Sequence, residues 1–326
     1  IPILVVDDDR SAGSRQLVER FAASANFTIV DVVSGNDDVE HHLEHGTAWM
    51  ALTIPAGLGT EVASGRPTTV QVIADGTDSN STGVALGYAR TVVADYSAEQ
   101  SAARLPGGAR AAPIDVDIRV WFNPQLESRD FMVPGIVALL LLVVTTNLSA
   151  MAIVREREVG TLEQLNVTPL ARWELIVGKL LPYALIGMFD VVLVTLVSVY
   201  WFEVPFLGSF PLLFACSLMY LLSTLGLGLF VSTISQTQQQ ASMTATFFFL
   251  TPMIYLSGFT FPIENMPQWI QYATYAIPLR YFLVIVRGIF LKGVGVDVLW
   301  PQMAALLACG LVLSTLATLR SSKRLA

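Results

Sequence analysis

The sequence is short of charge. Only 14% of its 326 residues are Asp, Glu, Lys or Arg, against 53% that are hydrophobic, whereas a typical soluble domain carries about 25% charged residues. So few charges cannot cover the surface of a soluble globule of this size. An ordinary soluble enzyme and a disordered chain are therefore excluded. A nucleic-acid binder is excluded too, because the net charge of −7 offers no basic surface.

Reactive and metal-binding residues are also scarce. Cys216 and Cys309 both lie in apolar stretches, which predicts packed side chains and no disulfide framework. His41 and His45 have the i, i+4 spacing of a metal-binding pair, but a solvated helix face explains the same pattern and is the favoured interpretation. The sequence has no HExxH or Gly-x-Ser-x-Gly pattern, and the Gly-Lys pair that begins at Gly178 is followed by Leu, which excludes a P-loop. We therefore predict no catalytic site and no metal site.

What the chain does contain is unevenly distributed. Residues 1–130 hold 9 Arg, no Lys and 18 Asp or Glu, whereas residues 131–326 hold 10 basic and 8 acidic residues. The first part also alternates strand-like and helix-like stretches, separated by turn residues such as Pro55 and Gly57. We expect a soluble α/β or α+β domain over residues 1–130 and a helical membrane domain over residues 131–326.

The expected elements of the first domain are five strands and three helices. The strands are residues 3–6, 27–33, 49–54, 69–74 and 114–122, and the helices are residues 11–23, 37–45 and 82–103. The opening ILVVDDD is similar to that of a response-regulator receiver domain, but residues 53–57 lack the phosphoacceptor Asp that should follow the third strand. Asp7, Asp8 and Asp9 are better explained as a solvated strand end that caps the next helix.

Long apolar stretches dominate the second part. An apolar helix needs about 20 residues to cross about 30 Å of hydrocarbon, and the predicted spans are residues 131–153, 180–201, 210–231, the shorter 243–257, and 299–319. Basic residues cluster between the first two spans and after the last, whereas the loop 202–209 has none. Because basic loops stay in the cytoplasm, residues 1–130 are predicted outside and the C-terminus inside. An outer domain with no span before it needs either a cleaved signal peptide or a further membrane helix ahead of residue 1; the helix is the favoured interpretation and gives six spans in all.

Residues 262–293 need a different explanation. The apolar stretch 277–291 is short and contains Arg280 and Arg287, and charges at the centre of a bilayer are costly. A crossing here would also place the basic C-terminus outside. We expect a re-entrant or interfacial helix pair on the outer face, where aromatic residues such as Trp269 and Tyr272 suit the membrane interface.

Residues 155–170 are predicted to leave the membrane as a short amphipathic helix. Apolar residues recur at every third position and form one face, until Pro169 ends the pattern. Such a helix can lie on lipid or dock on a partner protein. Its polar face mixes three Glu with two Arg, and acids are repelled by anionic lipid. Docking on a partner is therefore the favoured interpretation.

In this segment the sequence resembles a known family. The run REREVGTLEQL at residues 155–165, with residues 123–135 before it and residues 178–182, 257–267 and 278–292 after it, is similar to the ABC type-2 exporter permeases of the multidrug-efflux kind. The resemblance covers most of the chain and is weakest over residues 1–70. It implies an ABC type-2 exporter fold with six spans and a large outer, periplasmic domain between the first two. The additional helix expected from topology agrees with that count.

The resemblance also implies partners. Such permeases pair, as two copies or as paralogues, and separate ATPase subunits drive them, so ATP and Mg²⁺ are bound by the partner and not by this chain. A periplasmic adaptor and an outer-membrane channel often complete the exporter. The expected location is the bacterial inner membrane. The expected function is ATP-driven export of hydrophobic or amphiphilic small molecules, drugs among them, by alternating access.

Three groups of candidate site residues follow. By resemblance, a coupling helix at about residues 155–168 contacts the ATPase through Arg155, Glu156, Glu158, Gly160, Thr161, Glu163, Gln164 and Leu165. A substrate path is assigned to Thr145, Asn147, Asp190, Met243, Phe247 and Phe248, because Met and aromatic walls suit hydrophobic substrates and an acid inside a span is a functional candidate. An outer gate or interface is assigned to Glu264, Arg280 and Arg287. Helix packing, lipid contact and snorkelling are the alternatives.

Two other functions are weighed against drug export. The first keeps the fold but exports a lipid or glycan intermediate, and the sequence does not separate it from drug export. The second is a membrane receptor that senses a ligand outside without transport. A receptor needs an output domain inside, and only a few residues follow Leu319, which argues against it.

Overall fold

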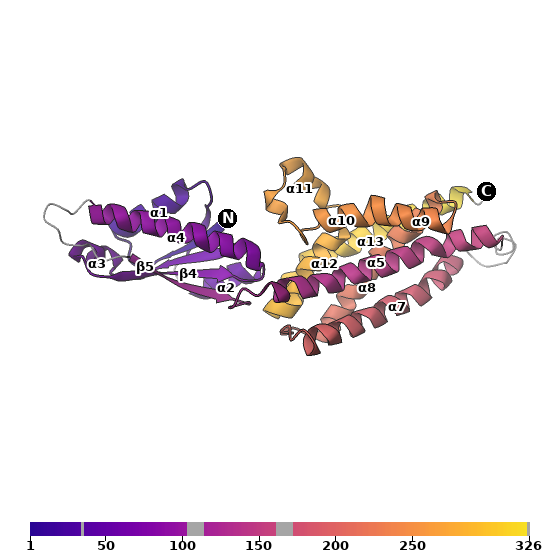
Figure 1. Ribbon diagram of the computed structural model, residues 1–326, viewed down its shortest axis with the longest axis horizontal. Coiled ribbons are helices and arrows are strands. Elements are labelled where there is room, and N and C mark those ends of the chain that lie inside the picture. The colour runs from indigo at the N-terminus through magenta and orange to yellow at the C-terminus, as the bar shows by residue number, and fades with distance from the viewer. Residues whose placement is uncertain (34–35, 103–113, 161–171, 325–326) are drawn as a thin grey trace. The chain divides into compact units, whose positions relative to one another are not determined.

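The structure, a computed structural model, describes residues 1–33, 36–102, 114–160 and 172–324. It consists of two compact units, Ile1–Ser128 (unit 1) and Arg129–Ala326 (unit 2), each described by itself (Figure 1). Unit 1 holds strands β1 (Pro2–Asp7), β2 (Thr28–Val33), β3 (Met50–Ile54), β4 (Thr68–Asp75) and β5 (Ile114–Trp121). Its helices are α1 (Ala12–Ala23), α2 (Asn36–Glu44), α3 (Leu58–Ser64) and α4 (Ser79–Ala102). The five predicted strands and three predicted helices are confirmed, and α3 is an addition.

The sheet of unit 1 is mixed, with strand order β2-β1-β3-β4-β5. Neighbouring strands are parallel except for the antiparallel pair β3–β4. Successive residues of a strand point to opposite faces, and β1 shows the result: Ile3 packs with Phe21 of α1, whereas Leu4 packs with Val39 and Leu43 of α2. Each face of the sheet therefore has its own apolar layer under helices.

The acidic end of β1 organises the start of α3. Asp9 accepts hydrogen bonds from the backbone amides of Gly57 (2.8 Å) and Gly59 (2.9 Å) and from the Ser11 hydroxyl. Partial burial raises the pKa of Asp9, but these hydrogen bonds outweigh it and hold the pKa below its usual value. The N-cap of α1 is Ser11, whose side chain accepts from two amides of the first turn. The prediction that the acids of residues 7–9 cap α1 is therefore wrong, because Asp9 reaches across to the distant helix α3.

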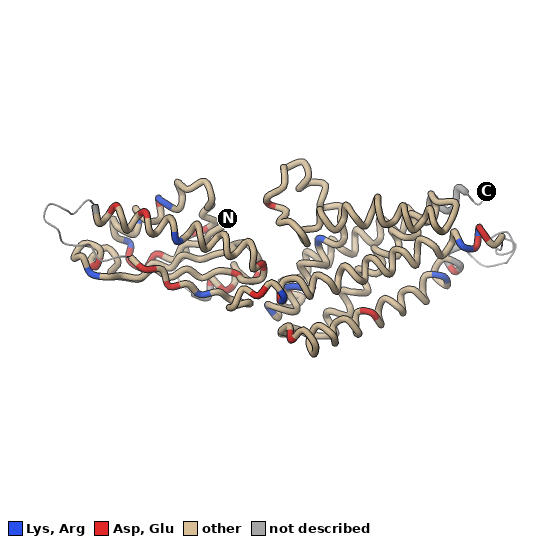
Figure 2. Tube along the Cα trace, in the orientation of Figure 1, with Lys and Arg blue, Asp and Glu red and all other residues tan. Residues whose placement is uncertain are grey.

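Unit 2 is helical. Its elements are α5 (Ser128–Val159), α7 (Arg172–Tyr200), α8 (Phe210–Ile234), α9 (Gln238–Thr244), η1 (Ala245–Leu250), α10 (Thr251–Leu256), η2 (Ile263–Asn265), α11 (Gln268–Thr274), α12 (Pro278–Arg287), η3 (Gly288–Lys292) and α13 (Val296–Arg324). Among the residues that the structure describes, four helices are each long and apolar enough to cross a membrane: Ser128–Val159, Ile176–Tyr200, Phe210–Ile234 and Val296–Leu319. They coincide with four predicted spans. Figure 2 shows their middle stretches almost free of charge, as hydrocarbon requires.

The predicted span at residues 243–257 falls on three consecutive helical pieces, α9, η1 and α10. The backbone is helical at both junctions, Ala245 and Thr251, so the pieces continue one another (Figure 1). At about 1.5 Å per residue, residues 238–256 reach about 28 Å, close to the thickness of the hydrocarbon layer. The π-helical piece η1 lies just before Pro252, whose ring clashes with the carbonyl four residues earlier and widens the turn.

Residues 268–292 form a bent pair of helices. α11 and the continuous α12–η3 segment meet at an angle of 79°, which fits either a broken span or a re-entrant loop. The bend is held locally, because the Tyr281 hydroxyl donates to the Tyr275 carbonyl (2.8 Å). The helix pair is confirmed, and its location on the outer membrane face stays a prediction.

Helix α8 packs closely against two neighbours through glycines. A Cβ on Gly228 would lie 2.7 Å from Ser149 Cβ and 3.0 Å from the Ala150 backbone nitrogen of α5. A Cβ on Gly226 would lie 3.0 Å from the Ser314 backbone nitrogen of α13. Small residues at such crossings let helix backbones approach. α8 is therefore the central helix on which α5 and α13 rest.

Candidate functional site

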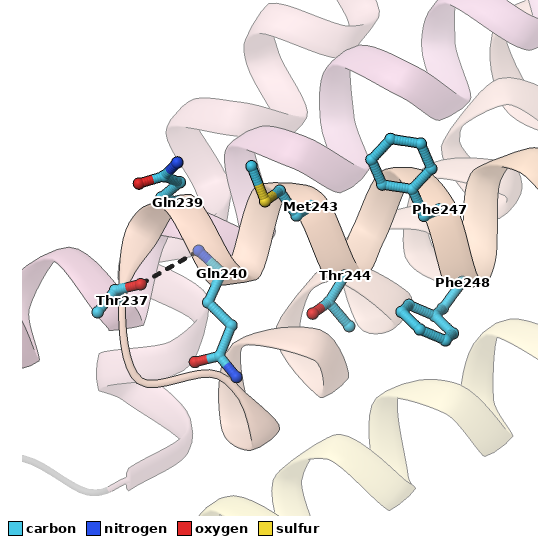
Figure 3. A pocket seen from close by; sticks show the side chains of 7 residues that line it. All are labelled: Thr237, Gln239, Gln240, Met243, Thr244, Phe247 and Phe248. Atoms are coloured by element: carbon cyan, nitrogen blue, oxygen red, sulfur yellow. Dashed lines mark hydrogen bonds between the residues drawn. The ribbon is translucent and has the colours of Figure 1, made fainter.

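A groove runs along α9 and into η1 (Figure 3). It has a volume of about 620 Å³ and is lined by Thr237, Gln239, Gln240, Met243, Thr244, Phe247 and Phe248. The amides and one hydroxyl lie toward the start of α9, and both phenyl rings lie toward η1 (Figure 3). The groove is therefore polar at one end and apolar at the other, which suits an amphiphilic molecule.

The polar end of the groove is held by capping interactions. Thr237 is the N-cap of α9, and its hydroxyl oxygen accepts a hydrogen bond from the backbone amide of Gln240 (3.1 Å; Figure 3). The Gln240 side chain reaches back and accepts from the Gln236 amide (2.9 Å). This reciprocal pattern resembles a capping box, in which two otherwise unpaired backbone donors are satisfied. It holds the first turn of α9 in place.

The apolar end of the groove is open. Phe247 and Phe248 are 67% and 75% exposed, which is unusual for two consecutive phenylalanines of a packed helix. Both lie in the π-helical piece η1, and short π-helical pieces are frequent at functional sites. Met243 and Phe247 lie on one side of the helix and Phe248 on the other (Figure 3), and together they give this part of the groove a soft, polarisable lining.

The structure brings together three of the six residues predicted for a substrate path: Met243, Phe247 and Phe248. The polar lining residues Thr237, Gln239, Gln240 and Thr244 were not predicted. The sequence held a signal for most of them, because four-residue spacing places side chains in rows along a helix. One row holds residues 239, 243 and 247, and the adjacent row holds residues 240, 244 and 248.

The other three predicted path residues lie away from the groove lining. Thr145 is fully buried, and its hydroxyl donates to Thr224 Oγ1 of α8 (2.8 Å), so it serves helix packing. Asn147 accepts a hydrogen bond from Ser242 of α9 (3.2 Å) and joins α5 to α9. Asp190 is half-buried on α7 and forms no hydrogen bond or ion pair within the described residues.

The predicted coupling segment begins at the end of α5. Gly160, with φ +81°, ends the helix in the left-handed conformation that glycine adopts readily. Thr161, Glu163, Gln164 and Leu165 lie outside the described residues, and Arg155 is exposed. Glu156 and Glu158 instead point to helices of their own chain: Glu156 pairs with Lys179 of α7, and Glu158 binds Gln238 of α9.

The predicted outer-gate residues are also engaged locally. The Arg280 guanidinium lies 4.0 Å above the Tyr275 ring and donates to the Thr274 hydroxyl, so it supports the bend between α11 and α12. The Arg287 guanidinium lies 3.7 Å above the Phe131 ring of α5. Glu264 is exposed. The two arginines therefore stabilise contacts between helices of unit 2.

The histidine pair forms contacts within α2 and its C-terminal turn. The rings of His41 and His45 lie 4.0 Å apart, and His45 Nδ1 forms a 2.8 Å hydrogen bond with the His41 carbonyl. Within the described residues there is no group of three or more His, Cys, Asp or Glu placed to hold a metal. Two ligands without a third make a weak site.

Comparison with known proteins gives a consistent result. Residues 1–319 match the family described as ABC-2 family transporter protein. The chain is 32% identical over 305 residues to the probable multidrug ABC transporter permease YbhR of Escherichia coli K12. The matched region covers 94% of this chain and 82% of that protein. It is 36% identical over 276 residues to the probable multidrug ABC transporter permease YbhS of the same strain, which covers 84% and 72%. It is 28% identical over 329 residues to the inner membrane transport permease YhhJ of that strain, with coverage of 99% and 85%.

Proposed function

Because the chain belongs to the ABC-2 family of transporter permeases and is a multi-pass permease subunit of an exporter, we propose that it exports hydrophobic or amphiphilic small molecules through the groove on α9. The observation that carries this proposal is the lining of that groove. Polar amides at one end and exposed Met and Phe side chains at the other match a molecule with a polar head and an apolar body.

The energy for export comes from a partner. The family implies ATPase subunits as partners, and we assign ATP and Mg²⁺ to those subunits. The segment 155–168 is the proposed contact with them; its first five residues form the last turn of α5, which ends at Gly160. A second permease, identical or paralogous, would face the groove from the other side. A periplasmic adaptor and an outer-membrane channel are further partners in this proposal, with the chain in the inner membrane and unit 1 in the periplasm.

The proposed mechanism is alternating access. ATP binding draws the ATPase subunits together, and the docked segments move the inner ends of the helices. The groove then exchanges access between the two sides of the membrane, and the substrate leaves because its affinity differs between the two states. Asp190, an intramembrane acid without a partner among the described residues, is a second contact for cationic substrates in this scheme.

Matched phenylalanine variants test the groove. In proteoliposomes that contain the permease and its ATPase, Phe247→Ala is expected to lower kcat/KM for ATP-dependent export of an amphiphilic cationic dye by about tenfold, because it removes an aromatic contact. Phe189→Ala on α7 is the control, since Phe189 has the same 67% exposure as Phe247 but lies outside the groove lining. Equal effects of the two variants, or export of glycolipid and of no dye, contradict the proposal.

A further inference from the structure

The last turn of α5 contacts three helices through three consecutive side chains. Glu156 pairs with Lys179 of α7. The Arg157 guanidinium donates to the Ser235 carbonyl at the end of α8 (2.8 Å). The Glu158 carboxylate accepts from the Gln238 backbone amide (3.0 Å) and, through its other oxygen, from the Gln238 side chain. This single turn therefore joins α7, α8 and α9.

The signs of two of these charges match the helix ends that they contact. Arg157 lies at the C-terminus of α8, where unpaired carbonyls give a partial negative charge. Glu158 lies at the N-terminus of α9, where unpaired amides give a partial positive charge. The reverse arrangement would be repulsive at both ends. The two side chains therefore hold the turn between α8 and α9, residues 235–237, from its two sides.

The last turn of α5 belongs to the proposed coupling segment and also contacts the start of α9, next to the groove. Glu158 belongs to the proposed coupling segment, residues 155–168, and Gly160 ends the helix two residues later. Gln239 and Gln240, the polar end of the groove, follow Gln238 directly. The Glu158–Gln238 contact therefore connects the end of α5 directly to the polar end of the groove.

We propose that the end of α5 is the transmission point of this exporter, with Arg157 and Glu158 as positioning residues that carry movement of the cytoplasmic segment to α9. The inference rests on the proposed function and deepens it. It also changes the role assigned to Glu158, because both of its carboxylate oxygens bind α9, which gives it a role inside the chain in place of direct contact with the ATPase.

Compensating substitutions at positions 158 and 238 test the inference. The background carries Cys216→Ala and Cys309→Ala, with Met243→Cys as the reporter in the groove, in complex with the ATPase partner. The variants are Glu158→Lys, Gln238→Glu and the two together, with Glu158→Lys/Gln239→Glu as the matched control. Each single variant is expected to reduce the ATP-dependent change in maleimide labelling at position 243 by about fivefold or more, because it breaks the contact. The Glu158→Lys/Gln238→Glu pair replaces these hydrogen bonds with an ion pair between the same two positions and is expected to return the change to within about twofold of the parent.

The control and the milder variants separate the alternatives. Glu158→Lys/Gln239→Glu is expected to stay defective, since Gln239 lines the groove and forms no hydrogen bond with Glu158 within the described residues. If Glu158 served the ATPase directly, Gln238→Glu would not rescue it. If it served only as a helix cap, Gln238→Glu alone would be harmless, because an acid suits a helix N-terminus. Either result overturns the inference. Glu158→Gln, which keeps the shape of the side chain, shows the same loss in weaker form if the lysine variant does not fold.

Two readouts distinguish this inference from the proposed function. Maleimide labelling at position 243 needs no substrate, whereas dye export does. If the parent changes its labelling with ATP but the wild-type protein exports no dye, the proposed substrates are contradicted and the transmission point stands. A parent that exports dye but shows no ATP-dependent labelling change overturns the transmission point.

Discussion

Single carboxylates in this protein bind helix N-termini that belong to distant parts of the chain. Asp9 binds the amides of Gly57 and Gly59 at the start of α3, and Glu158 binds Gln238 at the start of α9. Amides at a helix N-terminus favour negative charge. Each contact joins elements that chain connectivity leaves apart, so a single residue here decides where a short helix lies.

Replacing Asp9 is expected to loosen α3. Asp9→Asn weakens two amide contacts and should lower the stability of the α3 segment by about 1 kcal/mol, as the loss of a capping interaction does. Hydrogen–deuterium exchange of the detergent-solubilised protein at pH 7 should then show about fivefold faster exchange over residues 57–64. The control is Asp8→Asn, because Asp8 is exposed and its carboxylate forms no hydrogen bond within the described residues.

The same contact predicts a dependence on pH. The pKa of Asp9 is lower in the folded protein than its ordinary value of 3.8. The stabilisation is therefore complete above that value and is lost as the pH falls through the folded pKa. At a pH below the folded pKa of Asp9, wild type and Asp9→Asn should therefore show the same protection of residues 57–64 against hydrogen exchange, once exchange rates are corrected for pH. A difference that persists there would show that the carboxylate charge is not its cause.

Whole elements of unit 2 are arranged around α8. Its glycines let α5 and α13 approach at backbone distance, and Thr145 and Ser149 of α5 add hydrogen bonds to Thr224 and to the Leu225 carbonyl. Within a bilayer, apolar side chains gain little from contact with each other, since lipid is equally apolar. Close packing and these hydrogen bonds therefore provide the stability of the central helix pair.

A methyl group on this interface should separate the helices. Gly228→Ala places a Cβ 3.0 Å from a backbone nitrogen of α5, and overpacking of this kind costs about 1–3 kcal/mol. We expect a melting temperature lower by roughly 5 °C for the detergent-solubilised protein. Gly178→Ala on α7 is the matched control, because its Cβ would meet nothing within 4 Å. An equal loss in both variants would point to helix backbone effects and away from packing.

On the scale of the whole molecule, the helices alternate in direction and define two ends of unit 2. At one end, the last turn of α5 contacts Lys179 of α7 and both sides of the α8–α9 turn. The other end carries exposed aromatic side chains, Tyr200, Trp201, Trp269 and Tyr272 among them. Aromatic residues of this kind favour the membrane interface. The arrangement supports the proposed orientation, with the first end in the cytoplasm.

Labelling of single cysteines tests this orientation. In the background without native cysteines, Glu203→Cys should react with a membrane-impermeant maleimide in intact spheroplasts, because the loop 202–209 is proposed to lie outside. Gln236→Cys, in the α8–α9 turn, should react only after the membrane is opened. Both positions are exposed, so burial does not explain a difference. The opposite pattern would invert the proposed topology and remove the ATPase contact from the cytoplasm.

Local pattern alone determined much of this protein. Four spans, five strands and three helices of unit 1 follow from hydrophobic period and length, which depend only on neighbouring residues. Met243, Phe247 and Phe248 could be assigned to a cavity wall from residue type. The run at residues 155–165 pointed to the family, although its second half lies outside the described residues.

The tertiary structure decided which residues meet. The strand order, the placement of the short helix α3, and the contacts of Thr145, Arg157 and Glu158 all bring together residues that are far apart in the sequence. Glu158 and Gln238, for example, are 80 positions apart. Period and composition indicate that a side chain is buried or polar, but not which helix passes beside it, because that depends on the packing of all the helices together. The groove and the transmission point exist only at this level.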